Sequence, residues 1–141
     1  MAIRFYSDEV SFQPKNKHKI SNWLKQAAAS EEKKIGSLSY VFVSKNKILE
    51  INKKYLKHDY YTDIITFDNS TGDTISGEMY ISVDTVKENA KDYQVDFSEE
   101  LLRVMIHGML HLCGYLDNND VEQQKMREME TKYIRLSEYI L

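Results

Sequence analysis

The residues with the clearest chemical potential lie in one short segment, in which His107 and His111 are four positions apart. Side chains at that spacing project from the same face of a helix, one turn apart. Gly114 follows three positions later and can end the helix in a left-handed conformation. Asp117, after three more residues, can then fold back toward the imidazoles. Three protein ligands with an open fourth position are typical of a catalytic zinc site, so the segment predicts a metal-dependent hydrolase.

The segment that carries the histidines is expected to be a helix from about residue 99 to residue 113. Its apolar contacts come from a separate set of positions: Leu102, Met105, Ile106, Met109 and Leu110. Arg103, His107 and His111 recur every four residues and form a polar column beside that set. The alternative is a pair of core histidines that hydrogen-bond to backbone carbonyl groups, which an isolated pair at this spacing does not exclude. The glycine and the aspartate that follow favour the metal site.

The spacing H-x3-H-x2-G-x2-D resembles the extended zinc motif of metzincin-type proteases, with an aspartate in place of their third histidine. Those proteases carry a glutamate directly after the first histidine as the general base, where this chain has Gly108. Loss of a general base typically slows a reaction by about 100- to 10,000-fold. The ligand pattern is therefore kept while the peptidase chemistry is missing, which indicates a different hydrolase.

The rest of the chain predicts the elements that must hold this segment. Strands are expected at residues 2–6, 38–44, 63–67 and 77–82, and helices at 17–33, 46–56, 84–93, 99–113 and 119–136. No repeat, low-complexity tract or linker-like segment interrupts residues 1–141, so one domain is expected. The elements predict an α+β fold in which about five helices surround a mixed sheet of about four strands.

Bulk composition limits the classes of protein that the chain can belong to. The chain has 141 residues, of which 42% are hydrophobic and 29% are charged, as is ordinary for a globular protein. No apolar run approaches the roughly 18 residues that span a bilayer, and the first residues lack the apolar core of a secretory signal. Cys113 is the only cysteine, which excludes an internal disulfide and fits the reducing cytoplasm. We therefore expect a cytoplasmic protein without a membrane partner.

The formal net charge of −3 hides a strong asymmetry along the chain. Residues 15–57 carry eleven lysines against three glutamates, whereas residues 58–141 carry seventeen acidic and seven basic side chains. Such a distribution can give one basic face for phosphate groups on a mildly acidic protein. Ordinary solvated helix faces explain it equally well, so charge alone does not decide the partner.

Three segments together resemble the YbeY family of bacterial endoribonucleases that mature ribosomal RNA. Residues 107–115 (HGMLHLCGY) are similar to the family's H-G-x-L-H-L-x-G-Y. Residues 52–55 (NKKY) and 62–67 (TDIITF) are similar to N-x-x-[YF] and T-D-V-L-S-F, and residues 77–82 (GEMYIS) are similar to G-D-I-x-I-S. The order of the elements also matches, so the resemblance covers most of the chain.

Two positions depart from the family pattern. The family usually ends its histidine motif with D-H, where this chain has Leu116 and Asp117. The third ligand carried across by the resemblance is therefore Asp117, which zinc accepts at a similar distance, and Asp120 is the alternative if the turn is shifted. The family usually has an arginine after N-x-x-[YF], where it is expected to face substrate phosphate, and this chain has Leu56 there.

Arg103 and His58 are the candidates to take over substrate binding from the missing arginine. Arg103 lies one turn before His107 in the same polar column. Its alternative role is that of a surface salt-bridge partner for Glu99 or Glu100.

The resemblance implies hydrolysis of single-stranded RNA in the maturation of small-subunit ribosomal RNA, with the ribosome or ribosomal proteins as further partners. Zn²⁺ held by His107, His111 and Asp117 would activate a water and polarise the scissile phosphate. The nucleophile is either that water or the RNA 2′-hydroxyl, and the sequence identifies no general base. The lysine-rich stretch is a candidate track for the RNA, with Tyr60 and Tyr61 as stacking surfaces.

Two other functions stay open at this point. A ribosome-associated module in which zinc only braces the fold predicts a fourth protein ligand, and Cys113 points about 200° round the helix from His111. A metal-dependent peptidase or amidase requires a glutamate from elsewhere, for which Glu78 and Glu100 are the candidates. Two imidazoles and a carboxylate also suit iron, nickel or manganese, so the sequence does not identify the metal.

Overall fold

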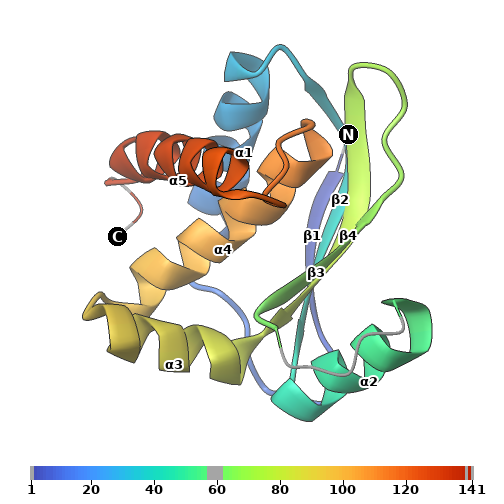
Figure 1. The fold of residues 1–141 in the computed structure, drawn as a ribbon, viewed down its shortest axis with the longest axis vertical. Coiled ribbons are helices and arrows are strands. Elements are labelled where there is room, and N and C mark those ends of the chain that lie inside the picture. Colours follow the sequence, from blue (N-terminus) through green and yellow to red (C-terminus); the bar gives the residue numbers. More distant parts are fainter. Residues whose placement is uncertain (1, 57–61, 139, 141) are drawn as a thin grey trace.

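The computed structural model describes residues 2–56, 62–138 and 140, which form an open mixed sheet with helices on both faces (Figure 1). In chain order the elements are β1 (Ala2–Ser7), α1 (Lys17–Ser30), β2 (Lys34–Val43), α2 (Lys45–Leu56), β3 (Ile64–Asp68), β4 (Thr74–Ser82), α3 (Val83–Tyr93), α4 (Phe97–Leu112) and α5 (Asp120–Arg135). The strands lie in the order β1-β2-β4-β3. The first three are parallel, and β3 pairs antiparallel with β4 at the edge. The predicted α+β class, with four strands and five helices over the described residues, is confirmed.

Most element boundaries agree with the prediction to within a few residues, and β2 is the main exception. This strand begins at Lys34 rather than at residue 38. Its first half contains a register shift between Ile35 and Leu38 and few apolar residues, so neither composition nor alternation marks it as a strand. Pairing with β4, for example of Lys34 with Thr74, holds it in the sheet. The local sequence does not encode that tertiary interaction.

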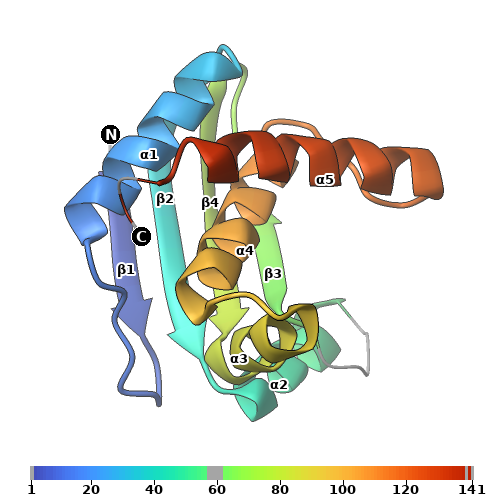
Figure 2. The ribbon, with the colours of Figure 1, turned by 90° about the vertical axis from the view of Figure 1, so that its left-hand side faces the viewer.

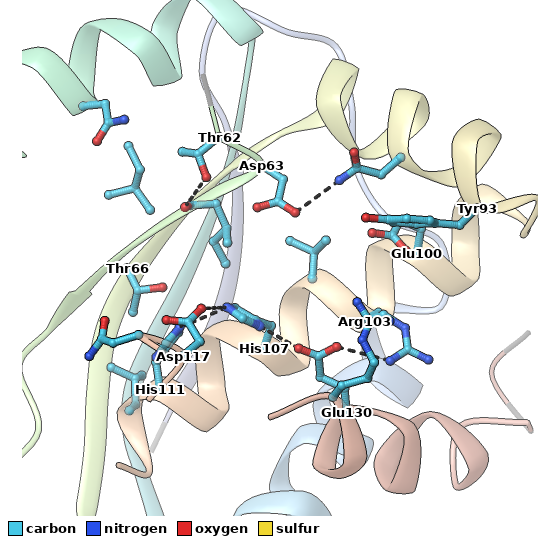
Figure 3. Close-up of a pocket in the computed structure, with 18 of the residues that line it drawn as sticks. Thr62, Asp63, Thr66, Tyr93, Glu100, Arg103, His107, His111, Asp117 and Glu130 are labelled. Carbon is cyan, nitrogen blue, oxygen red and sulfur yellow. Dashed lines mark hydrogen bonds and ion pairs between the residues drawn. The ribbon is translucent and has the colours of Figure 1, made fainter. Parts of the chain in front are cut away.

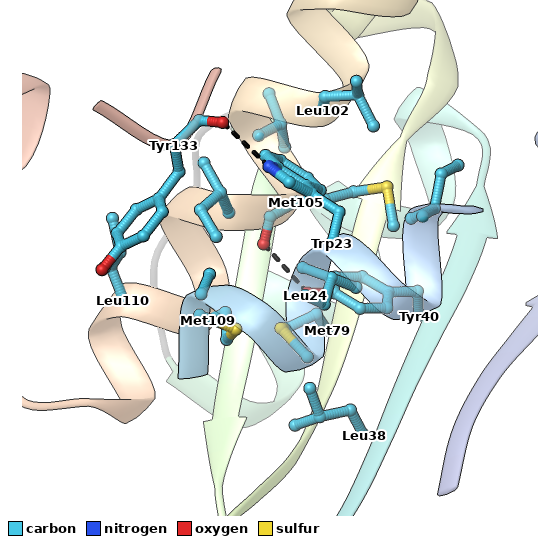
Figure 4. Close-up of a cluster of buried hydrophobic side chains, with 14 of the residues drawn as sticks. Trp23, Leu24, Leu38, Tyr40, Met79, Leu102, Met105, Met109, Leu110 and Tyr133 are labelled. Carbon is cyan, nitrogen blue, oxygen red and sulfur yellow. Dashed lines mark hydrogen bonds between the residues drawn. The ribbon is translucent and has the colours of Figure 1, made fainter. Parts of the chain in front are cut away.

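The main hydrophobic core lies between the sheet and the helices α1 and α4 (Figures 2 and 4). Its largest fully buried side chains include Trp23, Leu24, Leu38, Tyr40, Phe42, Met79, Leu102 and Met105. Two hydrogen bonds cross this core: the Trp23 indole donates to the Tyr133 carbonyl at 2.8 Å, and the Tyr40 hydroxyl donates to the Met105 carbonyl at 3.0 Å. These hydrogen bonds offset the cost of burying the polar groups, and they help to fix α4 and α5 against the rest of the core.

A smaller cluster covers part of the other face of the sheet, where α2 packs against β3 and β4 (Figure 1). Its buried members are Val43, Ile48, Ile51 and Ile65. α4 is the central helix of the opposite layer and contacts β3, β4, α1, α3 and α5. Within the described residues, no helix combines the length and the apolar character needed to cross a bilayer.

Candidate metal centre

Three side chains meet at the C-terminal end of α4, as their spacing predicts (Figure 3). The Nε2 atoms of His107 and His111 are 3.0 Å apart, and each lies 3.4 Å from Oδ2 of Asp117. Zinc–ligand bonds of about 2.0–2.1 Å at tetrahedral angles place neighbouring ligand atoms about 3.3 Å apart. The three donor atoms therefore form one face of a tetrahedron of the size that a divalent ion requires, and these residues could hold such an ion. Over the described ranges, this is the one group of His, Cys, Asp or Glu side chains brought together in this way.

The turn after α4 brings Asp117 back to the histidines. Gly114 has a φ of 105°, a left-handed conformation that residues with a side chain rarely adopt. Its N–H donates to the carbonyl of His111, and the N–H of Tyr115 donates to the carbonyl of Leu110, both at 3.0 Å. This pair of bonds is a Schellman motif, which reverses the chain direction at the end of a helix. The prediction that the glycine ends the helix in a left-handed turn is confirmed.

The hydrogen bonds of the imidazoles determine which ring nitrogens face the centre. Nδ1 of His111 donates to the backbone carbonyl of Tyr115 at 2.9 Å. Nδ1 of His107 donates to the carboxylate of Glu130 at 2.6 Å. Since both partners are acceptors, the proton of each neutral ring sits on Nδ1, and each Nε2 carries a lone pair. Two lone pairs and a carboxylate oxygen within 3.4 Å of one another repel unless a cation lies between them, so the donor set fits a metal ion.

Glu130 anchors His107 from α5 (Figure 3). Its side chain is only 6% exposed, and its other oxygen accepts a hydrogen bond from Nη1 of Arg103 at 3.2 Å. Burial by itself lowers the pKa of His107, but the hydrogen bond and charge of Glu130, joined by Asp117, outweigh burial and raise that pKa overall. A carboxylate behind a ligating imidazole fixes the ring and makes its free nitrogen a stronger ligand.

A second anchor holds His111 through the backbone of Tyr115. The Tyr115 hydroxyl donates to one oxygen of Glu31 at 2.8 Å, and the hydroxyl of Tyr133 donates to the other oxygen. Burial, followed by the hydrogen bond to Glu31, raises the pKa of Tyr115 to about 12, so this hydroxyl keeps donating at neutral pH. The Glu31 carboxylate therefore joins the end of α1, the turn after α4, and α5 in one polar junction.

Gly108 occupies the position after the first histidine, where the metzincin-type motif has its glutamate. It is buried, and a Cβ atom there would lie 2.8 Å from Cδ1 of Ile64 and 2.9 Å from Sδ of Met79. Cβ atoms do not approach other atoms so closely, so a larger residue at this position would require the ends of the Ile64 and Met79 side chains to move. Of the two glutamates considered for a peptidase, Glu78 is exposed on β4 and Glu100 lies in the pocket, and neither belongs to the three-residue group.

The three candidate ligands line a pocket of about 910 Å³, whose other end is acidic (Figure 3). At that end, Asp63 accepts a hydrogen bond from Nδ2 of Asn89 at 3.2 Å. Glu100 is 4% exposed, and its carboxylate makes no hydrogen bond or ion pair with the part of the chain that the structure describes. Burial, followed by the charge of Asp63, raises the pKa of Glu100 to about 7. Burial likewise raises the pKa of Asp63.

The residues predicted to bind substrate are placed only in part. Arg103 lines the pocket, but its guanidinium group pairs with Glu130 rather than with either of the neighbouring glutamates. His58 lies outside the described residues, as do Tyr60 and Tyr61. The guanidinium group of Arg103 therefore holds Glu130, which in turn orients the candidate ligand His107.

The turn also distinguishes the two aspartates considered as third ligand. The side chain of Asn119 accepts a hydrogen bond from the N–H of Glu122 at 2.9 Å and caps α5, which makes Asp120 the first helical residue. Asp117, and not Asp120, belongs to the three-residue group. Cys113 lies outside that group and packs partly buried against the core, where burial raises the pKa of its thiol to about 11.

The lysine-rich stretch does not form one basic face beside the pocket over the described residues. Its described lysines belong mostly to α1, β2 and α2, and α1 and α2 lie on opposite faces of the sheet (Figure 1). None of the described residues that line the pocket is a lysine, and the stretch contributes only Asn52 and Leu56 to that lining. The lysines that are close together in the sequence are therefore not gathered at the candidate site over the described residues.

Glu130 is the main residue of the centre that the sequence prediction missed. A signal for it exists, because positions 126, 130 and 133 form one stripe of α5, and the other two members, Met126 and Tyr133, are buried and apolar. A carboxylate on such a stripe must find a partner when the helix packs. The partner could not be identified before the position of α5 relative to α4 was known.

Comparisons with known proteins agree with this geometry. A family model described as Endoribonuclease YbeY matches residues 2–137. A protein named Endoribonuclease YbeY from Parabacteroides distasonis is 46% identical over 136 residues, which cover 96% of this chain and 96% of that protein. Another protein of that name, from Flavobacterium psychrophilum, is 45% identical over 131 residues, which cover 93% of this chain and 94% of that protein. A solution structure of a Thermotoga maritima protein matches with a TM-score of 0.68 and 28% identity, over 96% of this chain and 89% of that one. The match to the family model over nearly the whole length, with these identities, shows that the chain belongs to the YbeY endoribonuclease family.

Proposed function

We propose that the chain is a metal-dependent endoribonuclease that cleaves single-stranded RNA and acts in the maturation of small-subunit ribosomal RNA. Membership of a family whose curated relatives are named Endoribonuclease YbeY supports the class of reaction. The observation that carries the proposal is the convergence of the donor atoms of His107, His111 and Asp117 on the wall of an open pocket.

A divalent ion at this position would polarise the scissile phosphate, stabilise charge on the leaving oxygen and lower the pKa of a coordinated water. The chain's own residues supply the ligands and their orientation. Glu130 and the Tyr115 carbonyl hold the two imidazole planes so that both Nε2 lone pairs point to one position. Two neutral imidazoles and one carboxylate leave the centre with a net positive charge, which favours a phosphate group over a neutral substrate.

We propose Zn²⁺, one per chain, as the ion, because tetrahedral zinc accepts imidazole nitrogen and carboxylate oxygen at nearly equal distances. The same donors suit iron, nickel and manganese, and elemental analysis of the purified protein distinguishes among them. In this proposal residues 1–141 act as one domain in the cytoplasm, where the RNA substrate is presented by the ribosome or its precursor.

A non-catalytic module braced by zinc would need a fourth protein ligand. Over the described ranges the group holds only three residues, and Cys113 is not among them. The open side of the group faces a pocket of about 910 Å³, which suits a substrate better than a purely structural ion.

The test combines metal analysis with cleavage of a fluorescent single-stranded RNA oligonucleotide. The protein is assayed as purified, after chelation and dialysis, and after re-addition of Zn²⁺, with a duplex RNA and a peptide as control substrates. We expect cleavage of the single strand that disappears on chelation and returns with the metal. Cleavage that is indifferent to chelation would contradict the proposal, and metal-dependent cleavage of the peptide alone would favour an amidase. Analysis of the RNA ends identifies the nucleophile, because attack by the 2′-hydroxyl leaves a cyclic phosphate.

A further inference from the structure

We propose that the RNA strand runs from the metal centre along α5, where Arg127 and Arg135 bind its phosphate groups. We call this surface the α5 track, and its polar members are Gln124, Arg127, Glu128, Thr131, Lys132 and Arg135. The inference rests on the proposed endoribonuclease function and specifies how the same site holds its substrate.

The main pocket does not by itself attract a polyanion. The described residues that line it include six carboxylates and two guanidinium groups. One of these guanidinium groups belongs to Arg103, which is paired with the buried Glu130 at 3.2 Å. The end of the pocket with Asp63 and Glu100 repels phosphate, so an RNA strand must approach the metal centre from another side.

Arg127 lies where three hollows of the surface meet. It lines the main pocket, a groove of about 560 Å³ along α5, and a hollow of about 470 Å³ whose lining also includes His107 and the carboxylates of Asp117, Asp120 and Glu130. Arg127 is the one arginine or lysine among the described residues that line this hollow. Arg127 is exposed, and unlike Arg103 it makes no hydrogen bond or ion pair with the residues that the structure describes. Its guanidinium group is therefore available to an anion that approaches the candidate ligands from α5.

The groove extends this positive surface along one face of the helix. Arg127, Thr131 and Arg135 are spaced four residues apart, so they project from the same side over about 12 Å of helix axis. Lys132 borders the groove, with its ammonium group 5.2 Å from the centre of the Tyr133 ring. A row of cations of this length can follow the phosphate groups of one sugar–phosphate backbone.

Two further features suit an extended ligand. Glu128 is the one acidic residue among the described residues that line the groove, and its carboxylate accepts a hydrogen bond from Nε2 of Gln124 at 3.4 Å. α5 crosses over α4, and its N-terminal half extends past the edge strand β3 (Figure 2). A strand bound along this helix can therefore continue into solvent on either side of the cleavage position.

The experiment compares Arg127→Ala, Arg135→Ala and the double variant with Lys125→Ala. Lys125 is the matched control, because it is an exposed cation on the same helix that lines none of the three hollows. Steady-state cleavage of the single-stranded RNA is measured with metal-loaded protein at several salt concentrations. Metal content and the melting temperature are measured in parallel.

We expect the double variant to raise KM about tenfold at low salt and to leave kcat within about twofold, since it removes phosphate contacts and no ligand. The slope of log KM against log salt should become shallower by about 0.7 for each lost contact with a single strand. Each single variant should show about half of the change in slope that the double variant shows. Lys125→Ala should match the wild type.

The outcomes separate the two proposals. If the wild type cleaves RNA in a metal-dependent way and the arginine variants match Lys125→Ala in KM and salt slope, the α5 track is overturned and the proposed function stands. A fall in kcat with unchanged KM and slope also overturns the track. If the wild type neither binds nor cleaves the oligonucleotide, the proposed function fails and the α5 track fails with it.

Discussion

The two ends of the main pocket hold carboxylates in opposite electrostatic surroundings. At the metal end, Asp117 lies 3.4 Å from both imidazole nitrogens. Glu130 is likewise paired there, with His107 at 2.6 Å. At the other end, Glu100 is buried near Asp63, and its pKa rises to about 7, first through burial and then through that neighbour's charge.

The difference shows that neighbours rather than residue type decide what an acid does in this pocket. A carboxylate beside imidazole nitrogens can coordinate a metal ion directly, or it can orient an imidazole that does so. A buried carboxylate beside another carboxylate favours its neutral form. One cavity is therefore divided into a part that suits a cation and a part in which the pKa of the carboxyl groups is raised.

Removal of a ligand from the metal end should have the largest effect. We expect His111→Ala to lose bound metal and to reduce RNA cleavage by about 1,000-fold or more, because two donors do not hold the ion against solvent. The fold should persist, since the imidazole is half-buried and lies at the end of α4. Elemental analysis, the cleavage assay and a melting curve check this, with His18→Ala on α1 as an exposed control. Full metal content together with full activity would remove His111 from the site.

The two aspartates near the turn should differ sharply. Asp117→Ala should weaken metal binding by about 100-fold or more, because it removes a donor atom from the tetrahedral face. Asp120→Ala should change metal binding by less than about twofold, because that residue lies outside the three-residue group. Competition with a chromophoric chelator measures both, and the reverse ranking would mean that the turn presents the other carboxylate.

The anchor behind the first imidazole should matter less than a ligand. We expect Glu130→Gln to weaken metal binding by about 10- to 100-fold, as is typical when a partner of a ligating histidine is altered. The amide keeps the size of the side chain but removes the charge that pairs with Arg103. The same competition assay applies, with the exposed Glu128→Gln on α5 as control. An unchanged metal affinity would show that His107 is oriented by packing alone.

The smallest effect should come from the acidic end and should depend on pH. The pKa of Glu100 is raised in the folded protein to about 7, so its protonated form favours folding. This contribution is complete below the unfolded pKa of about 4.3 and is lost as the pH rises through 7. Glu100→Gln should therefore be more stable than the wild type by about 1–3 kcal/mol at pH 8 and nearly equal to it at pH 4.5. Thermal unfolding of chelated protein tests this, with Glu99→Gln as control, and an advantage that is independent of pH would contradict it.

The convergence of the three candidate ligands was predictable because its information is local. Helical periodicity places His107 and His111 on one face, and Gly114 identifies the turn that returns Asp117. These features need no knowledge of how distant segments pack. The α+β class was predictable for the same reason, since most strands and helices have the expected periodicity.

The remaining features depend on tertiary contacts that periodicity does not encode. Glu130 reaches His107 only because α5 packs across α4. The charge of Asp63 acts on Glu100 only because the start of β3 lies beside that helix. The described lysines of the lysine-rich stretch do not line the pocket, because consecutive elements of an α+β fold point to different faces. Arg127 was overlooked since nothing in the sequence of α5 distinguishes it from other surface arginines.

The close packing at Gly108 has an evolutionary consequence. Peptidases with the same histidine spacing need a glutamate at this position, but any side chain here would collide with Ile64 and Met79. A glutamate introduced here would therefore have to displace these two side chains, which belong to the layer between α4 and the sheet. A change of one catalytic residue in this motif therefore also requires a change in how the helix packs on its neighbours.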